Sequence, residues 1–427
     1  MPEPNHDWPD GLRKNWAAAD RSCHPPRQLR LNAAIKCLEL EVFSLLWYLF
    51  FEIVESGGGI MIMQQALNYA VLGSGNGGRA FCAQIAAKGS PVVMYEPLEE
   101  TADYLRLRAE KEMFLEGDIQ TGGSLRGVTM DMHEAVGDAD VILIVVPSFA
   151  HPPLFQKLIP QLKDGQHVVI VPGNYGGLLL KKMMADARAP VNISISETAT
   201  LPYACRISAY NTVTIHKKKS QIKIATSPRA NNPFSVAVMN AVFGGFIRYL
   251  PGGNPLAMGL DNINQILHPL PVLLNYGAIE KNPETFRHYM DGVTPLISEK
   301  MMQMDEERLA IGRAFGLDLM STLDQLKMYY GKNDAQTYHE YVNSPESPYR
   351  DIVGHNVRSR YLTEDVPGLH VPAVQLAQRA GVTVPLMELC VQLTSALHDV
   401  DYASQGTTLA KLGIADKKPE EIIALSA

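Results

Sequence analysis

A glycine-rich turn between a short apolar run and a helix-compatible stretch constrains the fold of this chain more than any other feature. Residues 68–78 read NYAVLGSGNGG, and residues 79–89 continue as RAFCAQIAAKG. In such a strand, turn and helix, Gly73 permits the tight turn, Gly75 lets the backbone approach a pyrophosphate, and Gly78 allows close helix packing. The anion then lies at the helix N-terminus, where backbone N–H groups point outward. The pattern predicts a Rossmann-type unit that binds a dinucleotide.

The same unit contains the residues that we expect to contact the dinucleotide. They are Gly73, Gly75, Asn76, Gly77, Gly78, Arg79 and Glu96. Glu96 ends a second predicted strand, 91–95, and lies 23 residues after the first glycine, where an acidic side chain accepts hydrogen bonds from ribose hydroxyls. It favours NAD, and Glu99 and Glu100 add charge that would repel a 2′-phosphate. Arg79 could still pair with such a phosphate, so NADP stays open, and Glu96 could instead be a solvated carboxylate.

Further apolar runs indicate that the unit continues as a parallel sheet. The runs are residues 140–147, 167–172 and 192–196, with helix-like segments at 155–162 and 178–187. This alternation predicts right-handed crossovers and a doubly wound α/β sheet. Two last runs, 212–216 and 221–225, are joined by the basic stretch 217–220, which predicts a terminal hairpin with a solvated turn. We expect the dinucleotide-binding domain to cover residues 64–228.

Beyond that boundary the strand signal fades, and apolar periodicity interrupted by Pro and Gly predicts an all-helical domain over residues 229–427. Within it, residues 261–275 read DNINQILHPLPVLLN. Asn264 and His268 are four residues apart and project from one helix face, so they can touch one ligand. Pro269 removes a backbone donor and should kink the helix beside the imidazole. A core histidine that is hydrogen-bonded to Asn264 is the alternative.

A second polar stretch, residues 358–366 (RSRYLTEDV), is predicted to be a loop or a short helix. Arg360 and Asp365 are five residues apart, so they would point to different sides of a regular helix. Their joint use in one site would require an irregular backbone or different partners. A surface ion pair of little energetic weight is the alternative.

Charge and composition exclude several classes of function. The 427 residues carry a formal net charge of −7, with 46% hydrophobic and 19% charged residues, which provides no broad positive field for nucleic acid or anionic lipid. Five cysteines, an odd number without a CxxC pair, indicate neither a disulfide framework nor a zinc site. We therefore expect a cytoplasmic protein without a metal site and without nucleic-acid or membrane partners.

Residues 1–60 differ from the rest of the chain. Their apolar run, 42–54, is shorter than the roughly twenty residues needed to cross a bilayer. The codons of three glycines just before Met61 would resemble a bacterial ribosome-binding site. We therefore expect a native start at Met61 or Met63, with residues 1–60 as a non-native or disordered extension.

Three motifs carry a resemblance to a known family. They are Gly73-x-Gly75-Asn76-Gly77-Gly78, Asn262-x-Asn264-x-x-x-His268-Pro269-Leu270-Pro271-x-Leu273-Leu274-Asn275 and Arg360-Tyr361-x-x-Glu364-Asp365-Val366. Together they resemble the octopine/nopaline (opine) dehydrogenases, bacterial N-(1-carboxyalkyl) amino acid dehydrogenases especially. The likeness covers residues 68 to 413, and residues 1–60 have no counterpart in it.

The resemblance implies NAD(P)H-dependent reductive condensation of an amino acid with a 2-oxo acid, expected to be pyruvate, through an imine to an opine, and the reverse oxidation. The family's catalytic histidine falls on His268, its partner aspartate on Asp365 and its substrate-binding arginine on Arg360. A histidine suits this chemistry because it exchanges a proton near neutral pH, and an arginine fork binds a carboxylate. Asn264 is added as a substrate-binding residue from its spacing alone. A homodimer stays open.

Two other functions fit the same architecture. One is a dehydrogenase of a hydroxyl substrate, of the glycerol-3-phosphate or ketopantoate type, but that class has a lysine-centred site and residues 261–275 contain no lysine. The other is a dinucleotide-binding protein that catalyses nothing. An assay in which cofactor oxidation needs both an oxo acid and an amine would separate these functions from the one that the resemblance implies.

Overall fold

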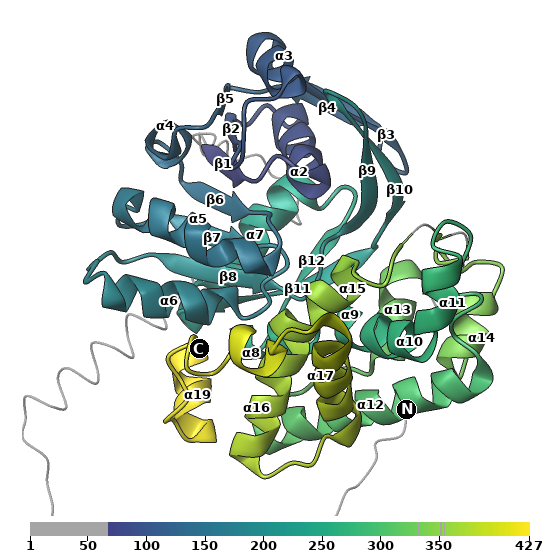
Figure 1. Ribbon diagram of the computed structural model, residues 1–427. Helices are drawn as coiled ribbons and strands as arrows, with labels where there is room; N and C mark the ends of the chain where they lie inside the picture. The colour runs from purple at the N-terminus through teal and green to yellow at the C-terminus, as the bar shows by residue number, and fades with distance from the viewer. Residues whose placement is uncertain (1–66, 332–333, 351, 354) are drawn as a thin grey trace, which may run out of the picture. The chain divides into compact units, whose positions relative to one another are not determined.

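The computed structural model describes residues 67–331, 334–350, 352–353 and 355–427 (Figure 1). The predicted extension over residues 1–60 and the predicted start at Met61 or Met63 lie outside the described residues. We refer to residues 67–251 as the sheet half and to residues 255–427 as the helical half.

The sheet half is built on a sheet whose central strand leads into the glycine turn. Within the described residues this larger sheet contains eight strands, in the order β12 (Arg248–Pro251), β11 (Gln221–Ser227), β8 (Ser194–Thr198), β7 (His167–Ile170), β6 (Val141–Ile144), β1 (Tyr69–Leu72), β2 (Val92–Tyr95) and β5 (Gly127–Thr129). β1 pairs in parallel with both β2 and β6, so the strand order reverses there. Sheets of this kind bind ligands at such a reversal, beyond the carboxyl ends of the strands.

Helices cover both faces of this sheet (Figure 1). They are α2 (Asn76–Ala87), α3 (Ala102–Glu110), α4 (Met132–Val136), α5 (His151–Leu158), α6 (Gly176–Asp186) and α7 (Asn232–Phe243), with 3₁₀ turns at Ser148–Ala150, Ile159–Gln161 and Arg229–Asn231. Tyr69 and Val71 belong to one apolar core, with Phe81 of α2, whereas Ala70 and Leu72 belong to another, with residues of α4, α5 and α6. Burial on both faces explains the continuous apolar runs of these strands, and the predicted doubly wound sheet is confirmed.

A second sheet, which the sequence did not predict, packs against α2. Among the described residues it contains four strands, in the order β4 (Thr121–Ser124), β3 (Glu112–Gly117), β10 (Thr212–Lys218) and β9 (Tyr203–Ala209). β4 reads TGGS, which has little strand propensity, and it is held by antiparallel pairing with β3. Pairing and packing, rather than local preference, create this sheet.

The predicted terminal hairpin is wrong. Its two strands exist, but β10 pairs with β9 and β3 in the small sheet, whereas β11 pairs with β8 and β12 in the larger one. The turn between them is not fully solvated either, because the Lys219 side chain is buried and donates to the Leu201 carbonyl at 2.8 Å. The larger sheet also continues beyond residue 228, where the sequence placed the domain boundary, because β12 pairs with β11.

The helical half follows β12. It contains α8 (Pro255–Leu260), α9 (Asn264–Leu267), α10 (Pro269–Leu274), α11 (Tyr276–Lys281), α12 (Pro295–Ala314), α13 (Thr322–Tyr330), α14 (Tyr338–Asn343), α15 (Arg360–Thr363), a π-helical turn at Val366–His370, α16 (Val371–Ala380), α17 (Pro385–His398), α18 (Tyr402–Gln405) and α19 (Pro419–Ser426). Several of these helices begin with proline, which needs no intrahelical donor in the first turn. None of the helices in the described part of the chain has the length and apolarity to span a membrane.

A buried arginine holds the start of the helical half together. Arg308 of α12 is fully buried, and it donates to Asp305 at 2.7 Å and to Asp261 at 2.8 Å. Asp261 directly follows α8 and leads into α9. The network therefore connects the longest helix of this half to the segment that carries His268.

We expect Arg308→Met to lower the free energy of unfolding by about 3–5 kcal/mol, because it removes the buried guanidinium that two buried carboxylates share. The urea midpoint of the far-UV circular dichroism signal measures the loss. Arg313→Met is the matched control, since Arg313 lies on the same helix in an exposed pair with Glu306 and should change stability by less than about 1 kcal/mol. Equal midpoints for the two variants would contradict the role of the network.

Candidate active site

Three glycines of the turn, Gly73, Gly77 and Gly78, are required by close contacts. Gly73 has a φ of +119°, and a Cβ there would lie 2.4 Å from a carbonyl oxygen after β6. A Cβ at Gly78 would lie 1.8 Å from the Gly73 carbonyl oxygen, and one at Gly77 would lie 3.0 Å from Leu201. At Gly75 a Cβ would meet no atom within 4 Å, and this residue caps α2 without a side chain. The backbone at the start of α2 is therefore open to close approach at Gly75, which fits a pyrophosphate.

Asn76 and Arg79 connect this turn to the small sheet. Asn76 Oδ1 accepts a hydrogen bond from the backbone N–H of Ile207 on β9 at 2.8 Å. The Arg79 guanidinium is buried, and it donates to the carbonyl oxygens of Ser74, at 2.8 Å, and Tyr210. These donors hold the backbone of the turn in place. A contact between Arg79 and a 2′-phosphate stays a prediction.

Glu96 lies half-buried just after β2. One carboxylate oxygen accepts from the backbone N–H of Leu98 at 2.9 Å, and the other accepts from the hydroxyl of Ser74. Since Ser74 belongs to the glycine turn, the carboxylate is held beside the turn. This position fits a group that binds the ribose of a dinucleotide.

His268 lies between α9 and α10, and its imidazole is buried. Nδ1 lies 2.6 Å from Oδ2 of Asp365, which is also buried, and Nε2 lies 3.1 Å from the hydroxyl oxygen of Tyr289. The break before Pro269 confirms the predicted interruption of the helix. The carboxylate therefore orients the ring from one nitrogen, and the tyrosine hydroxyl can donate to the other.

Asn264 starts α9, one turn before His268. Its backbone N–H donates to Oδ1 of Asn262, whose amide donates to Oδ1 of Asn174 in the sheet half at 2.7 Å. Within the described residues the Asn264 side chain makes no hydrogen bond. The alternative interpretation, a core histidine hydrogen-bonded to Asn264, is therefore wrong, because the partners of His268 are Asp365 and Tyr289. The half-buried Asn264 amide is thus available to a ligand.

The backbone that carries Arg360 and Asp365 is irregular, as their spacing required. α15 is a single turn, and the π-helical turn Val366–His370 follows it. His370 Nε2 donates to the Gln265 carbonyl oxygen at 2.7 Å, which fastens this turn to α9. The irregular backbone lets Asp365 point inward while Arg360 points elsewhere.

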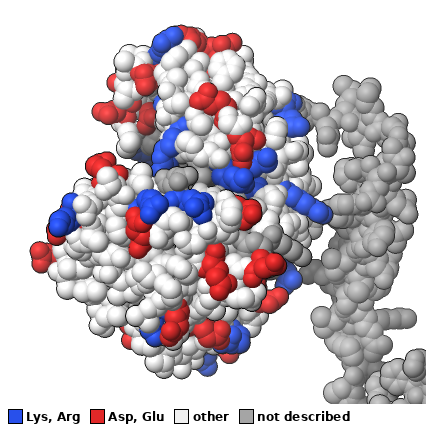
Figure 2. Space-filling view, turned by 90° about the vertical axis from the view of Figure 1, so that its right-hand side faces the viewer, with Lys and Arg blue, Asp and Glu red and all other residues white. Residues whose placement is uncertain are grey.

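Arg360 and Asp365 also have different partners. The Arg360 side chain is 60% exposed, and its Nε lies 3.2 Å from the buried carboxylate of Glu364. The other Glu364 oxygen accepts from the backbone N–H of Ser148 in the sheet half at 3.4 Å. The remaining donors of the Arg360 fork stay available for a carboxylate. Lys and Arg side chains gather in a band across one face of the molecule (Figure 2).

Sequence analysis did not assign a role to the aromatic side chains around His268. Tyr361 stacks on the imidazole, with ring centroids 3.8 Å apart and planes at 15°. His288 and His355 contact the Tyr361 ring at centroid distances of 4.8 and 5.0 Å. Tyr361 lies inside a recognised motif, but Tyr289 lies 21 residues after His268 in a segment without any motif, so no sequence signal pointed to it.

Burial controls the protonation of the His268–Asp365 pair. It lowers the pKa of His268 well below the usual value, and the positive charge of Arg360 lowers it further. Burial raises the pKa of Asp365 to about 7, against the opposing effect of Arg360. Because the two side chains share one contact, the pair binds one exchangeable proton below about pH 7 and releases it above. It can therefore deliver a proton or accept one near neutrality.

The sheet half provides a cradle for a dinucleotide, and the helical half provides a proton-exchanging imidazole. This combination is that of a dehydrogenase that uses a nicotinamide cofactor, in which the protein binds and orients the reactants while the cofactor carries the hydride.

Comparisons with known proteins agree with this class. The family model of the α-helical domain of NAD/NADP octopine/nopaline dehydrogenase matches residues 251–398, and that of the N-terminus of NAD-dependent glycerol-3-phosphate dehydrogenase matches residues 68–181. An opine dehydrogenase from Arthrobacter sp. (strain 1C) is 34% identical over 362 residues, which cover 83% of this chain and 97% of that protein.

Solved structures of octopine dehydrogenase have the same fold. One with NADH and L-arginine has a TM-score of 0.69 at 20% identity and covers 84% of this chain and 98% of that one. Another with NADH and pyruvate has a TM-score of 0.64 at 21% identity and covers 81% and 93%.

The chain belongs to the octopine/nopaline dehydrogenase family. It is an NAD(P)-dependent oxidoreductase that acts on a CH–NH bond, in the reductive condensation of an amino acid with a 2-oxo acid. The match to glycerol-3-phosphate dehydrogenase is confined to the sheet half, so it reflects the shared dinucleotide-binding unit.

The titration of the His268–Asp365 pair predicts opposite pH profiles for the two directions of catalysis. Reductive condensation consumes a proton, so its rate should fall as the pH rises through about 7, whereas oxidation of the opine needs a base and should rise over the same range. Initial rates of both directions between pH 5 and 10 measure this crossing.

Asp365→Asn tests the origin of these profiles. The variant should lose the change of rate near pH 7, and its turnover should fall by about 10²–10⁴-fold. The reason is that an amide cannot exchange the proton and cannot stabilise a protonated imidazole. Unchanged profiles in a folded Asp365→Asn protein would contradict the assignment. Asp401→Asn, at an exposed helix cap, is the control.

Proposed function

We propose that the chain condenses pyruvate with an amino acid, with NADH as the preferred reductant, and that His268, Asp365 and Arg360 are the residues that act on the substrates. The 2.6 Å contact between His268 and Asp365 is the observation that carries this proposal, because it joins a buried base to a carboxylate that controls its protonation. Arg360, with free donors beside that pair, supports binding of a substrate carboxylate.

The chemistry sets the task of each side chain. The amine of the amino acid adds to the oxo carbon, and loss of water from the adduct needs a proton at the leaving hydroxyl. His268 delivers that proton, which leaves a cationic imine, and Asp365 stabilises the charged ring. Arg360 holds a carboxylate so that the imine carbon is presented in one orientation. Asn264 supplies an amide that can bind a carbonyl or carboxylate oxygen.

The cofactor supplies the hydride when it is bound. Gly73, Gly75, Asn76, Gly77 and Gly78 would hold its pyrophosphate, with Arg79 supporting the turn. The carboxylate of Glu96, anchored to Ser74, supports a preference for NAD, because it can accept from two ribose hydroxyls but repels a 2′-phosphate.

We also propose a cytoplasmic location, a homodimer formed through the helical half, and domains that divide near the end of β12. The three cysteines in the described part of the chain are free and buried, which suits a reducing compartment.

His268→Ala should reduce turnover by about 10²–10⁴-fold, because a positioned proton donor is lost. The measurement is NADH oxidation with pyruvate and a panel of amino acids, with each co-substrate also omitted in turn. His133→Ala, an exposed histidine on α4, is the control and should keep full activity. A near-normal rate in His268→Ala would remove this residue from the mechanism. Oxidation of NADH with pyruvate alone would indicate a hydroxy-acid dehydrogenase instead.

Glu96→Gln should weaken discrimination against NADPH, since it removes the charge that repels the 2′-phosphate. We expect the ratio of kcat/KM for NADH to that for NADPH to fall by about tenfold or more. Glu280→Gln, at an exposed position on α11, is the control for the loss of one negative charge. A ratio that is the same in both variants would contradict the assignment.

A further inference from the structure

The proposed reaction joins two carboxylate-bearing substrates, and one arginine cannot hold both carboxylates in fixed positions. Arg360 has one fork, part of which already faces Glu364. The Asn264 amide can donate to a second carboxylate, but a second cationic group would bind it more strongly. The sheet half contains a candidate for this group.

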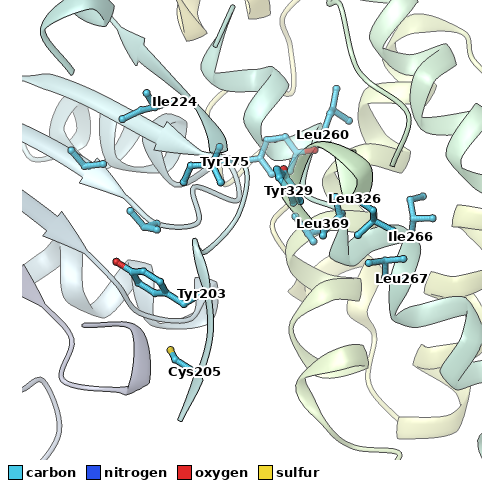
Figure 3. Close-up of a cluster of buried hydrophobic side chains, with 14 of the residues drawn as sticks. Tyr175, Tyr203, Cys205, Ile224, Leu260, Ile266, Leu267, Leu326, Tyr329 and Leu369 are labelled. Atoms are coloured by element: carbon cyan, nitrogen blue, oxygen red, sulfur yellow. The ribbon is translucent and has the colours of Figure 1, made fainter. Parts of the chain in front are cut away.

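Arg206 lies on β9 and faces away from the core of the sheet half. Along this strand Tyr203 and Cys205 are buried, whereas Ala204 and Arg206 are exposed, so the two pairs point to opposite sides. Figure 3 shows Tyr203 and Cys205 directed to one side of their strand, with the segment that carries Ile266 and Leu267 on the other side. By this alternation Arg206 lies on the face of β9 opposite to Tyr203 and Cys205, the side on which the segment of Ile266 and Leu267 lies in Figure 3.

The glycine turn fixes the position of this arginine. The N–H of Ile207, the next residue, donates to Asn76 Oδ1 at 2.8 Å, and Asn76 is the first residue of α2. The backbone next to Arg206 is thereby attached to the cradle expected to hold the dinucleotide. The position of the Arg206 backbone therefore depends on the position of the glycine turn.

The Arg206 guanidinium has unused donors. Nη1 donates to the carbonyl oxygen of Cys205 at 2.9 Å, and among the described residues no carboxylate lies within ion-pair distance. A guanidinium has five N–H donors, so most of this fork faces solvent. An exposed, unpaired arginine beside a site for anionic substrates is suited to bind one of them.

The charge of Arg206 reaches the ring that stacks on His268. Burial raises the pKa of the Tyr361 hydroxyl, and the positive charges of Arg360 and Arg206 both oppose this rise. One guanidinium from each half of the molecule therefore acts electrostatically on this hydroxyl. The centroid of the Tyr361 ring lies 3.8 Å from that of the imidazole, so both positive charges act on the ring that stacks on His268.

We propose that Arg206 binds the substrate carboxylate that Arg360 does not hold, so that each half of the molecule positions one of the two co-substrates. This inference rests on the proposed function. It makes Arg206 a specificity-determining residue that selects for a charged co-substrate.

Steady-state kinetics of Arg206→Met and Arg360→Met test the proposal, with the concentrations of pyruvate, the amino acid and NADH each varied in turn. We expect Arg206→Met to raise the KM of one carboxylate co-substrate by about 10- to 100-fold, and Arg360→Met to raise that of the other. The KM of NADH should stay within about twofold of the wild-type value in Arg206→Met.

Two further variants sharpen the test. Arg206→Lys keeps the charge without the fork and should recover part of the affinity, whereas Arg313→Met controls for the loss of one positive charge. One of the two arginine variants will have lost the group that binds the carboxylate of the amino acid. In that variant, the ratio of kcat/KM for the amino acid to kcat/KM for an amine without the carboxylate should be smaller than in the wild-type protein.

Three results would overturn the inference. They are unchanged KM values for both co-substrates, an effect of both variants on the same co-substrate, and an effect of Arg206→Met on the KM of NADH alone, which would place the guanidinium on a cofactor phosphate. Failure of the proposed function is distinguishable, because the wild-type protein would then show no NADH oxidation that depends on both co-substrates.

Discussion

The contact between His268 and Asp365 is the interaction on which the rest of the site depends. It joins side chains 97 residues apart, and both are buried, where an unpaired polar group or charge costs several kcal/mol. Two departures from regular helix make the contact geometrically accessible: the break before Pro269, and the π-helical turn Val366–His370. The site is therefore built where the helices of this half are interrupted, and burial then favours a single proton shared within the pair.

The sheet half contributes by holding the helical segments at the strand edge where the glycine turn lies. Tyr175, with a φ of +64°, follows β7, and its ring packs so closely on α8 that a Cβ at Gly259 would lie 2.6 Å from it (Figure 3). Asn174 accepts a hydrogen bond from Asn262, and Ser148 donates to Glu364. Loops at the carboxyl ends of parallel strands often bind ligands directly. Here two of them also anchor the segments that carry the imidazole and the arginine.

Local features of the chain were sufficient to predict much of the sheet and of the glycine turn. The glycine turn is recognisable because its requirements are largely local: Gly73 has a φ of +119°, and a Cβ at Gly78 would lie 1.8 Å from the Gly73 carbonyl oxygen. The strands β1, β6 and β7 were predictable from continuous apolar runs, since burial on both faces leaves no polar alternation. His268 and Asp365 were identified through a family resemblance rather than through spacing. Spacing did predict that joint use of Arg360 and Asp365 would require an irregular backbone or different partners, and the structure shows both.

By itself, the sequence determined the dinucleotide turn, the order of strands and helices around it, and the break beside His268, because each depends on residues only a few positions apart. Only the tertiary structure decided which partners those elements take. β10 and β11 resemble a hairpin locally, yet β10 pairs with β9 and β3 whereas β11 pairs with β8 and β12, and the intervening Lys219 is buried against the Leu201 carbonyl oxygen. The Tyr289 hydroxyl and the Arg206 guanidinium could not be predicted as site groups, because their roles depend on side chains that are distant in the sequence. Pairing and burial are long-range properties, and no local pattern encodes them.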